Sequence, residues 1–304
     1  MLKTLLSGLL PLLISGYGFS QSMVRSAVDS YRTTQDAASL DLLTANGKPK
    51  EVAAAIYASA IDTTISDHKG TVQLIRLLER KTTDPASRES YVVSLTEILW
   101  RSSASVGASS LKLMEQFERK SFSQSVKDDL MTYISEKSEN RSEAILLLGF
   151  IGNQNDISFL KNLEHYASIS KKDKYKVKLA LVRLNDAVTT EEYLAELGSR
   201  RINDELVTNV LPDLIYTHNQ EVYKVLLAEL NNQTPACLSA NNDSDEQILC
   251  AYRILEQLSP EIREFPVAVD KSGELAGDYE KALITAREWY VINAASFTIN
   301  ADHF

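Results

Sequence analysis

The chain has 304 residues, of which 44% are apolar and 24% are charged, so its composition is that of an ordinary soluble protein and excludes wholesale disorder. The formal net charge of −9 argues against general binding to nucleic acid or to anionic membranes, and we expect no nucleic-acid partner. With 11 glycines and 7 prolines the chain is poor in turn residues, which favours a fold made mostly of helices.

Residues 1–20 are expected to form a cleavable secretory signal peptide. Lys3 provides a positive start, residues 5–14 are mainly apolar, and small residues follow up to Ser20. The alternative is a membrane anchor, but the apolar segment is shorter than the roughly 20 residues that a span requires. We therefore expect an exported protein, periplasmic or secreted, whose mature chain (21–304) is a single helical repeat domain without a transmembrane segment.

Several helices are expected between the signal and the middle of the chain, because apolar residues recur there at helical spacing. A short helix is expected between Ser22 and about Ala45, and another over 51–61. Asp84 and Pro85 are expected to open a third, since an acidic N-cap followed by a first-turn proline is a typical helix start.

A repeat with a period of 33 or 34 residues runs through the middle of the chain. Three sets of apolar residues recur at this interval: Ala144, Val177 and Val210, then Leu148, Leu181 and Leu214, and about a dozen residues later Phe159, Tyr193 and Leu226. We divide this region into repeats at 108–140, 141–173, 174–206 and 207–240. Each repeat contains two amphipathic stripes that must pack against a partner helix and against the next repeat.

The clearest repeat begins with a helical stripe that includes Ala144 and Leu148. The segment Gly149-Phe150-Ile151-Gly152-Asn153 is expected to end that helix, and Asp156 to begin its partner. This Leu-Gly-Phe-Ile-Gly-Asn, Asp, Phe-Leu pattern resembles HEAT-like repeats, the two-helix units of α-solenoids, best over 141–230. The resemblance implies an all-α fold, an α-solenoid of about five to seven HEAT-like antiparallel helix pairs, and a habit of binding other proteins. It implies no catalytic residues.

A polar loop is expected between Cys237 and Cys250. In an exported chain a pair this close is expected to form a disulfide, the alternative being two small buried residues with free thiols. Within the loop, Asn241, Asp243 and Asp245 leave open a loose calcium site, although the EF-hand pattern is broken there.

The C-terminal region carries two more helix signals. Ser259-Pro260-Glu261 suggests a helix start, and a final helix is expected over 278–293. The tail from Ala294 onward is expected to be loose.

The chain carries no recognisable catalytic or metal-binding motif. The four histidines are widely separated in the chain, at His68, His165, His218 and His303, and we interpret them as surface or turn residues. We therefore predict no metal site and no cofactor. The acidic pairs Glu191-Glu192 and Asp204-Glu205 are interpreted as charges that complement helix N-termini rather than as catalytic pairs.

One charged feature stands above the background, a run of lysines at the junction of the second and third of the four repeats. The candidate partner-binding residues are Lys171, Lys172, Lys174 and Lys178, with Lys161 and His165 on the preceding helix. A solvated face is one interpretation, and a docking patch for an acidic partner is the other. The first hypothesis is an exported, non-catalytic scaffold that binds an unidentified protein partner. The alternative is a helical carbohydrate-processing or other envelope enzyme.

Overall fold

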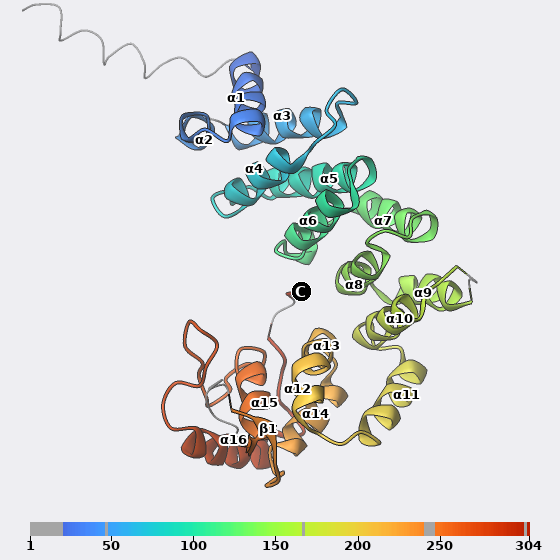
Figure 1. The fold of residues 1–304 in the computed structure, drawn as a ribbon, viewed down its shortest axis with the longest axis vertical. Coiled ribbons are helices and arrows are strands. Elements are labelled where there is room, and N and C mark those ends of the chain that lie inside the picture. Colours follow the sequence, from blue (N-terminus) through green and yellow to red (C-terminus); the bar gives the residue numbers. More distant parts are fainter. Residues whose placement is uncertain (1–20, 46–47, 166–167, 240–246, 301–302) are drawn as a thin grey trace, which may run out of the picture. The chain divides into compact units, whose positions relative to one another are not determined.

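In the computed structural model the chain is all-α, apart from one two-stranded sheet among the described residues (Figure 1). The structure describes residues 21–45, 48–165, 168–239, 247–300 and 303–304, so the predicted signal peptide lies outside it. Within these ranges no helix is both long and apolar enough to cross a membrane. The chain divides into two compact units, one ending at Tyr133 and the other beginning at Ile134, and each is described by itself.

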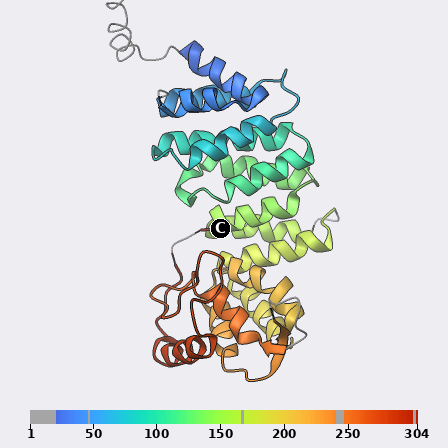
Figure 2. The ribbon, with the colours of Figure 1, turned by 60° about the vertical axis from the view of Figure 1, so that its left-hand side comes forward.

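The first unit consists of short helices that follow one another closely. They are α1 (Gln21–Thr34), α2 (Ala37–Ala45), α3 (Pro49–Ile61), α4 (Lys69–Glu79), α5 (Pro85–Arg101), α6 (Ala104–Met114), the 3-10 turn η1 (Arg119–Ser121) and α7 (Gln124–Glu136), which ends in the second unit. Helix α1 packs on α3 and α3 on α5, while α4 packs on α6. Helices two places apart in the sequence therefore lie side by side, as the blue to green helices of Figure 2 show.

Capping hydrogen bonds explain where two helices of the first unit begin. The Asp84 carboxylate accepts a hydrogen bond from the Ser87 amide at 2.9 Å, and Pro85 occupies the first turn of α5, as predicted. The single helix expected between Ser22 and Ala45 is instead two helices. Gln35 takes a positive φ of 54°, and the next residue, Asp36, accepts a hydrogen bond from the Ser39 amide at 2.7 Å. The chain turns there because a local carboxylate satisfies the backbone donors of a new helix.

The second unit continues the same kind of packing. It contains α8 (Arg141–Ile151), η2 (Gln154–Asp156), α9 (Ile157–Glu164), α10 (Lys171–Arg183), α11 (Ala187–Gly198), α12 (Asp204–Asn209), α13 (Leu211–Tyr216), α14 (Gln220–Glu229), β1 (Pro235–Leu238), β2 (Gln247–Leu249), α15 (Cys250–Leu258) and α16 (Tyr279–Asn293). Helix α8 packs on α10, α10 on α13 and α13 on α15, while α9 and α11 pack on α10 and α14 on α13.

The 33-residue interval appears in the helix caps as well as in the apolar residues. Asn153, Asp186 and Asn219 each accept a backbone hydrogen bond at the start of η2, α11 and α14 respectively. Ser170 and Asn203 do the same for α10 and α12. The equivalent leucines Leu148, Leu181 and Leu214 are all buried, as the repeat predicts. Equivalent residues thus perform equivalent structural tasks in successive helix pairs.

One feature of the repeats differs from the expectation, and another agrees with it in part. The helix expected around Leu214 is broken at Val210 into α12 and α13, because Pro212 has no amide hydrogen and its ring obstructs a continuous helix. The segment from Gly149 to Asn153 does end α8, as predicted, because the helix stops at Ile151 with Gly152 as its C-cap, but Gly149 itself lies within the helix. A Cβ on Gly149 would lie 2.7 Å from Cβ of Ala180, so this glycine permits α8 and α10 to approach closely.

Of four further predictions, two are confirmed and two are wrong. The final helix, α16, begins after Asp278, which caps it. Ser259-Pro260-Glu261 begins no helix, because the chain turns there and Ile262 forms an antiparallel bridge with Ile299. Of the two acidic pairs, Asp204-Glu205 lies in the first turn of α12 as expected. Glu191-Glu192 lies beyond the first turn of α11, where it complements no N-terminus.

Two short strands lie between the helices at the cysteine pair, with Cys237 in β1 and Cys250 at the start of α15, directly after β2. Strands β1 and β2 are antiparallel, with Cys237 opposite Ile248. Cys237 and Cys250 are joined by a disulfide, and both are buried. The proposed calcium residues Asn241, Asp243 and Asp245 lie outside the described residues.

Candidate functional site

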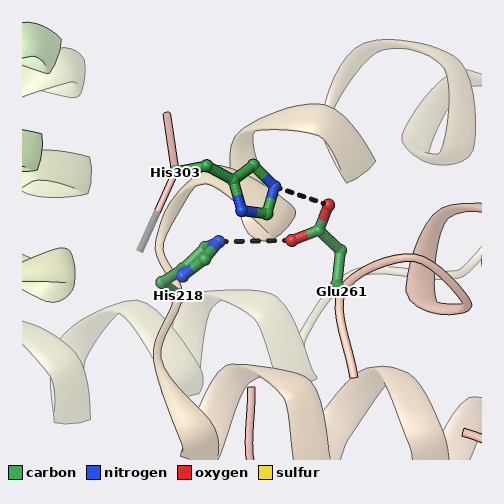
Figure 3. A group of neighbouring side chains, drawn as sticks. All are labelled: His218, Glu261 and His303. Carbon is green, nitrogen blue, oxygen red and sulfur yellow. Dashed lines mark hydrogen bonds and ion pairs between the residues drawn. The ribbon is translucent and has the colours of Figure 1, made fainter. Parts of the chain in front are cut away.

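Three side chains of the second unit converge on one point, and these are His218, Glu261 and His303 (Figure 3). Nε2 of His218 lies 3.2 Å from Oε2 of Glu261, and Nε2 of His303 lies 3.2 Å from Oε1 of the same carboxylate. The two imidazole rings meet edge to face, with centroids 5.2 Å apart. Among the described residues this is the one group of three or more such side chains close enough to hold a metal ion together.

His218 is positioned by the turn between α13 and α14. Its φ is 45°, and Asn185, one repeat earlier, has a φ of 58° in the corresponding turn. Asn and His are among the few residue types other than glycine that tolerate this left-handed conformation. The next residue, Asn219, caps α14 and also donates to the Val182 carbonyl at 3.2 Å. The repeat architecture therefore fixes the backbone from which the His218 side chain projects.

Glu261 comes from the turn that follows α15 and is 8% exposed. Its amide donates to the Leu258 carbonyl at 3.0 Å, and its own carbonyl accepts from the Asn300 amide at 2.6 Å. Burial alone would raise the pKa of Glu261, but hydrogen bonds from His218 and His303, together with the positive charge of these rings, bring the pKa down to about 2. The group is therefore a buried carboxylate ion that is stabilised by two imidazoles.

His303 lies in the C-terminal tail. The sequence suggested that this tail is loose, but its described residues are held by several hydrogen bonds. The Arg263 amide donates to the Thr298 carbonyl at 2.9 Å, and Gln220 donates to the Phe297 carbonyl at 3.2 Å. Asn300 donates through its side chain to the Pro260 carbonyl at 2.6 Å. These contacts bind the tail to the turn after α15 and to the start of α14.

The last two residues are bound to the repeat helices themselves. The Arg183 guanidinium donates to the His303 carbonyl at 2.6 Å, and it also donates to the Tyr216 carbonyl. Its guanidinium carbon lies 5.0 Å from the ring centroid of Phe150 and 4.8 Å from that of Tyr216. Phe304 packs against the same two rings, at 5.7 and 5.4 Å between centroids. An aromatic and cationic cluster therefore holds the end of the chain beside the histidines.

The lysines predicted as a docking patch lie around α10, and most of them are paired with acidic side chains. Lys172 pairs with Glu143 at 3.0 Å and Lys178 with Glu196 at 2.6 Å. On the preceding helix, Lys161 pairs with Asp186 at 2.7 Å. This pairing reduces the positive potential that an acidic partner would meet. Lys171, Lys174 and His165 are exposed, and a docking patch formed by the six candidates stays a prediction.

The histidines agree only in part with the expectation that all four lie at the surface or in turns. His218 lies in a turn and His165 at the surface, as expected, but His68 precedes α4 and is buried, which lowers its pKa. The sequence did not associate His218 with His303, because the two are far apart in the chain and share no motif. The one signal in the sequence was that His218 lies 33 residues after Asn185, at the equivalent position of the next repeat.

Comparisons with known proteins give no family for this chain. No family model matches it, and neither a curated protein nor a solved structure is found to match.

Proposed function

We propose that the protein is an exported, non-catalytic scaffold in which HEAT-like helix pairs form an α-solenoid stack that binds another protein. The observation that carries this proposal is a set of polar contacts that join neighbouring helix pairs. Ser142 donates to Asp173 at 2.6 Å, and Asn219 donates to Asn185 at 3.1 Å. Arg183 donates to the carbonyl of Tyr216, 33 residues further along. These contacts are expected where no pair can bury its apolar stripe alone.

The surface made by the second helices is the proposed binding face. A shallow hollow there lies over the start of α11 and the start of α14. Its lining combines an apolar side chain with polar and acidic ones, and its members are Asn185, Ala187, Thr190, Glu191, Leu194, Asn219 and Glu221. Val188, at 62% exposure, lies on the same helix as most of them. A mixed surface of this kind suits a partner segment with apolar side chains and basic groups.

An enzymatic role has weaker support. Glycosidases use a pair of carboxyl groups, one with a raised pKa, in an enclosed site. Among the described carboxyl groups with a shifted pKa, Asp129 is the one whose pKa is raised, through burial and the charges of Glu97 and Asp128. Asp129 is exposed on α7 and does not line the hollows between α4 and α6, between α11 and α14, or between α1 and α3. We therefore favour binding over catalysis.

Site-specific photo-crosslinking in the producing cell tests the proposal. A crosslinking residue at Glu191, in the hollow, is expected to trap one discrete partner that mass spectrometry identifies. The matched control is Glu288, exposed on α16 and outside the hollow. If neither Glu191 nor Lys161 or Lys224 on the other second helices traps a partner, and the protein hydrolyses a member of a glycan panel, the enzyme reading replaces the scaffold.

Export is tested separately by fractionation. The protein recovered outside the cytoplasm is expected to begin at Gln21, since cleavage is predicted after Ser20. A cytoplasmic protein that retains Met1 would contradict the export part of the proposal and leave the binding part to the crosslinking test.

A further inference from the structure

We infer that His218, Glu261 and His303 bind one divalent transition-metal ion of the zinc type, and that the ion fastens the C-terminal tail to the second unit. The inference does not depend on the proposed partner, because it concerns a site formed entirely by this chain. All three ligand atoms lie within 4.8 Å of one another.

The chemistry of the donors selects the class of ion. Two imidazole nitrogens and one carboxylate oxygen form a set that zinc and its neighbours in the first transition series prefer. Calcium and magnesium prefer oxygen ligands throughout, so two imidazoles disfavour them. Three protein ligands leave the fourth tetrahedral position to water or to a group from outside the chain.

The separations bring the three side chains near the spacing that such an ion requires. A tetrahedral zinc ion with bonds of about 2.0–2.1 Å holds its ligand atoms about 3.3 Å apart. Each imidazole nitrogen lies 3.2 Å from a different oxygen of Glu261, and one ligand atom from each residue lies within 4.8 Å of the others, so the side chains must draw closer around the ion. Figure 3 shows both rings directed at the carboxylate, each toward one of its two oxygens. Binding requires that each Nε2 present its lone pair, so a protonated ring releases that proton to solvent and a neutral ring moves it to Nδ1; neither changes the fold.

The three ligands are held in advance by contacts that do not involve the metal. His218 projects from a left-handed turn that recurs at Asn185, and Glu261 is bonded through its backbone to Leu258 and Asn300. The His303 carbonyl is held by Arg183. Because these contacts have already fixed the backbones, little conformational entropy is lost when the ion binds. The pre-formed geometry distinguishes this group from a chance meeting of polar side chains.

The exposure of the ligands also suits a metal site. Glu261 and His218 have side chains that are 10% and 12% exposed, whereas the side chain of His303 is 52% exposed. The buried carboxylate supplies a negative charge in a poorly solvated place, where its attraction for a cation is strong. The exposed His303 gives the ion a path of entry from solvent. In this arrangement the ion binds the tail to two segments that are distant in sequence.

The test titrates the full chain with zinc alone, against a chromogenic chelator, under conditions that exclude other metals. We expect one zinc ion per chain, and visible ligand-field bands of tetrahedral character when cobalt(II) replaces zinc. His303→Ala and Glu261→Gln are each expected to weaken binding by at least about 100-fold, since loss of mere supporting groups already costs about 10–100-fold. The matched control, His165→Ala, removes an exposed histidine of the same unit and is expected to bind zinc as the wild type does.

A second readout reports on the tail. Zinc is expected to raise the thermal midpoint of the wild type and of His165→Ala, and to leave that of His303→Ala unchanged. Because His303 is half exposed, its replacement leaves the core intact, and His303→Ala alone decides the question if Glu261→Gln does not fold. The inference is overturned if the wild type binds zinc more weakly than about 100 µM, or if His303→Ala binds zinc as tightly as the wild type.

Discussion

The guanidinium of Arg183 donates a hydrogen bond of 2.6 Å to the main-chain carbonyl of His303, which lies 120 residues later in the chain. The same guanidinium donates to the Tyr216 carbonyl and lies over the rings of Phe150 and Tyr216. One buried side chain therefore joins α10, α13 and the C-terminal tail.

Replacing Arg183 with lysine should destabilise the second unit by about 2–4 kcal/mol. A lysine keeps the charge but cannot reach two carbonyls in the fork geometry of a guanidinium, so buried acceptors lose their donors. Urea unfolding followed by circular dichroism measures the effect. Arg201→Ala, at an exposed position of the same unit, is the control and should change stability by less than about 0.5 kcal/mol. Equal stabilities of the two variants would refute the assigned role of Arg183.

Gly149→Ala should destabilise the protein by about 1–3 kcal/mol, although alanine is the better helix former. The added Cβ would lie 2.7 Å from Cβ of Ala180 and against the Tyr216 hydroxyl. Gly198→Ala is a matched control near the end of α11, because a Cβ there meets nothing within 4 Å. It should be neutral or stabilising by up to about 1 kcal/mol. The packing account fails if both substitutions shift the urea midpoint in the same direction.

Asp173 should contribute stability that disappears at low pH. Burial alone would raise the pKa of Asp173, but hydrogen bonds from Ser142 and Ser170 and the charge of Arg141 lower it below its ordinary value of 3.8. A lowered pKa in the folded state means that the contribution is present above pH 3.8 and is lost as the pH falls through the lower folded value.

The comparison of wild type with Asp173→Asn checks this sign. We expect the wild type to be more stable by about 1 kcal/mol at neutral pH, the usual worth of a helix cap. The difference should shrink as the pH is lowered below 3.8. A difference that stayed constant down to acid unfolding would show that the charge of Asp173 plays no part.

Reduction of the disulfide between Cys237 and Cys250 should lower the free energy of unfolding by about 3 kcal/mol on the chain-entropy estimate for a short loop. The measurement is urea unfolding with and without reductant. A double substitution, Cys237→Ser with Cys250→Ser, should give the reduced value under both conditions. Wild-type curves that do not respond to reductant, together with free thiols in a labelling assay, would contradict the bridge.

The sequence predicts well those elements whose signal is local. The start of α5 follows from Asp84 and Pro85, and α16 follows from its apolar spacing after Asp278. The caps at Asn153, Asp186 and Asn219 lie at the repeat interval and could also have been read from the sequence.

Features that depend on contacts distant in sequence escaped prediction. Gly149 resembles a helix stop until the neighbouring Tyr216 hydroxyl is placed beside it. The tail resembles a loose end because the groups that hold it, Arg183 above all, lie in another part of the chain. The convergence of His218 with His303 has the same origin, since each histidine is unremarkable in its local sequence.

The central claim is that each helix pair buries its apolar side only by packing against the neighbouring pairs. Hydrogen exchange of wild type and Leu214→Ala, followed by mass spectrometry, tests it most directly, because Leu214 is fully buried in a core cluster shared by the helices from α10 to α16. A cavity at this site should cost about 2–5 kcal/mol and accelerate exchange in all of these helices together. Faster exchange confined to α13 and α14 would contradict the claim, because that helix pair would then be an independent unit.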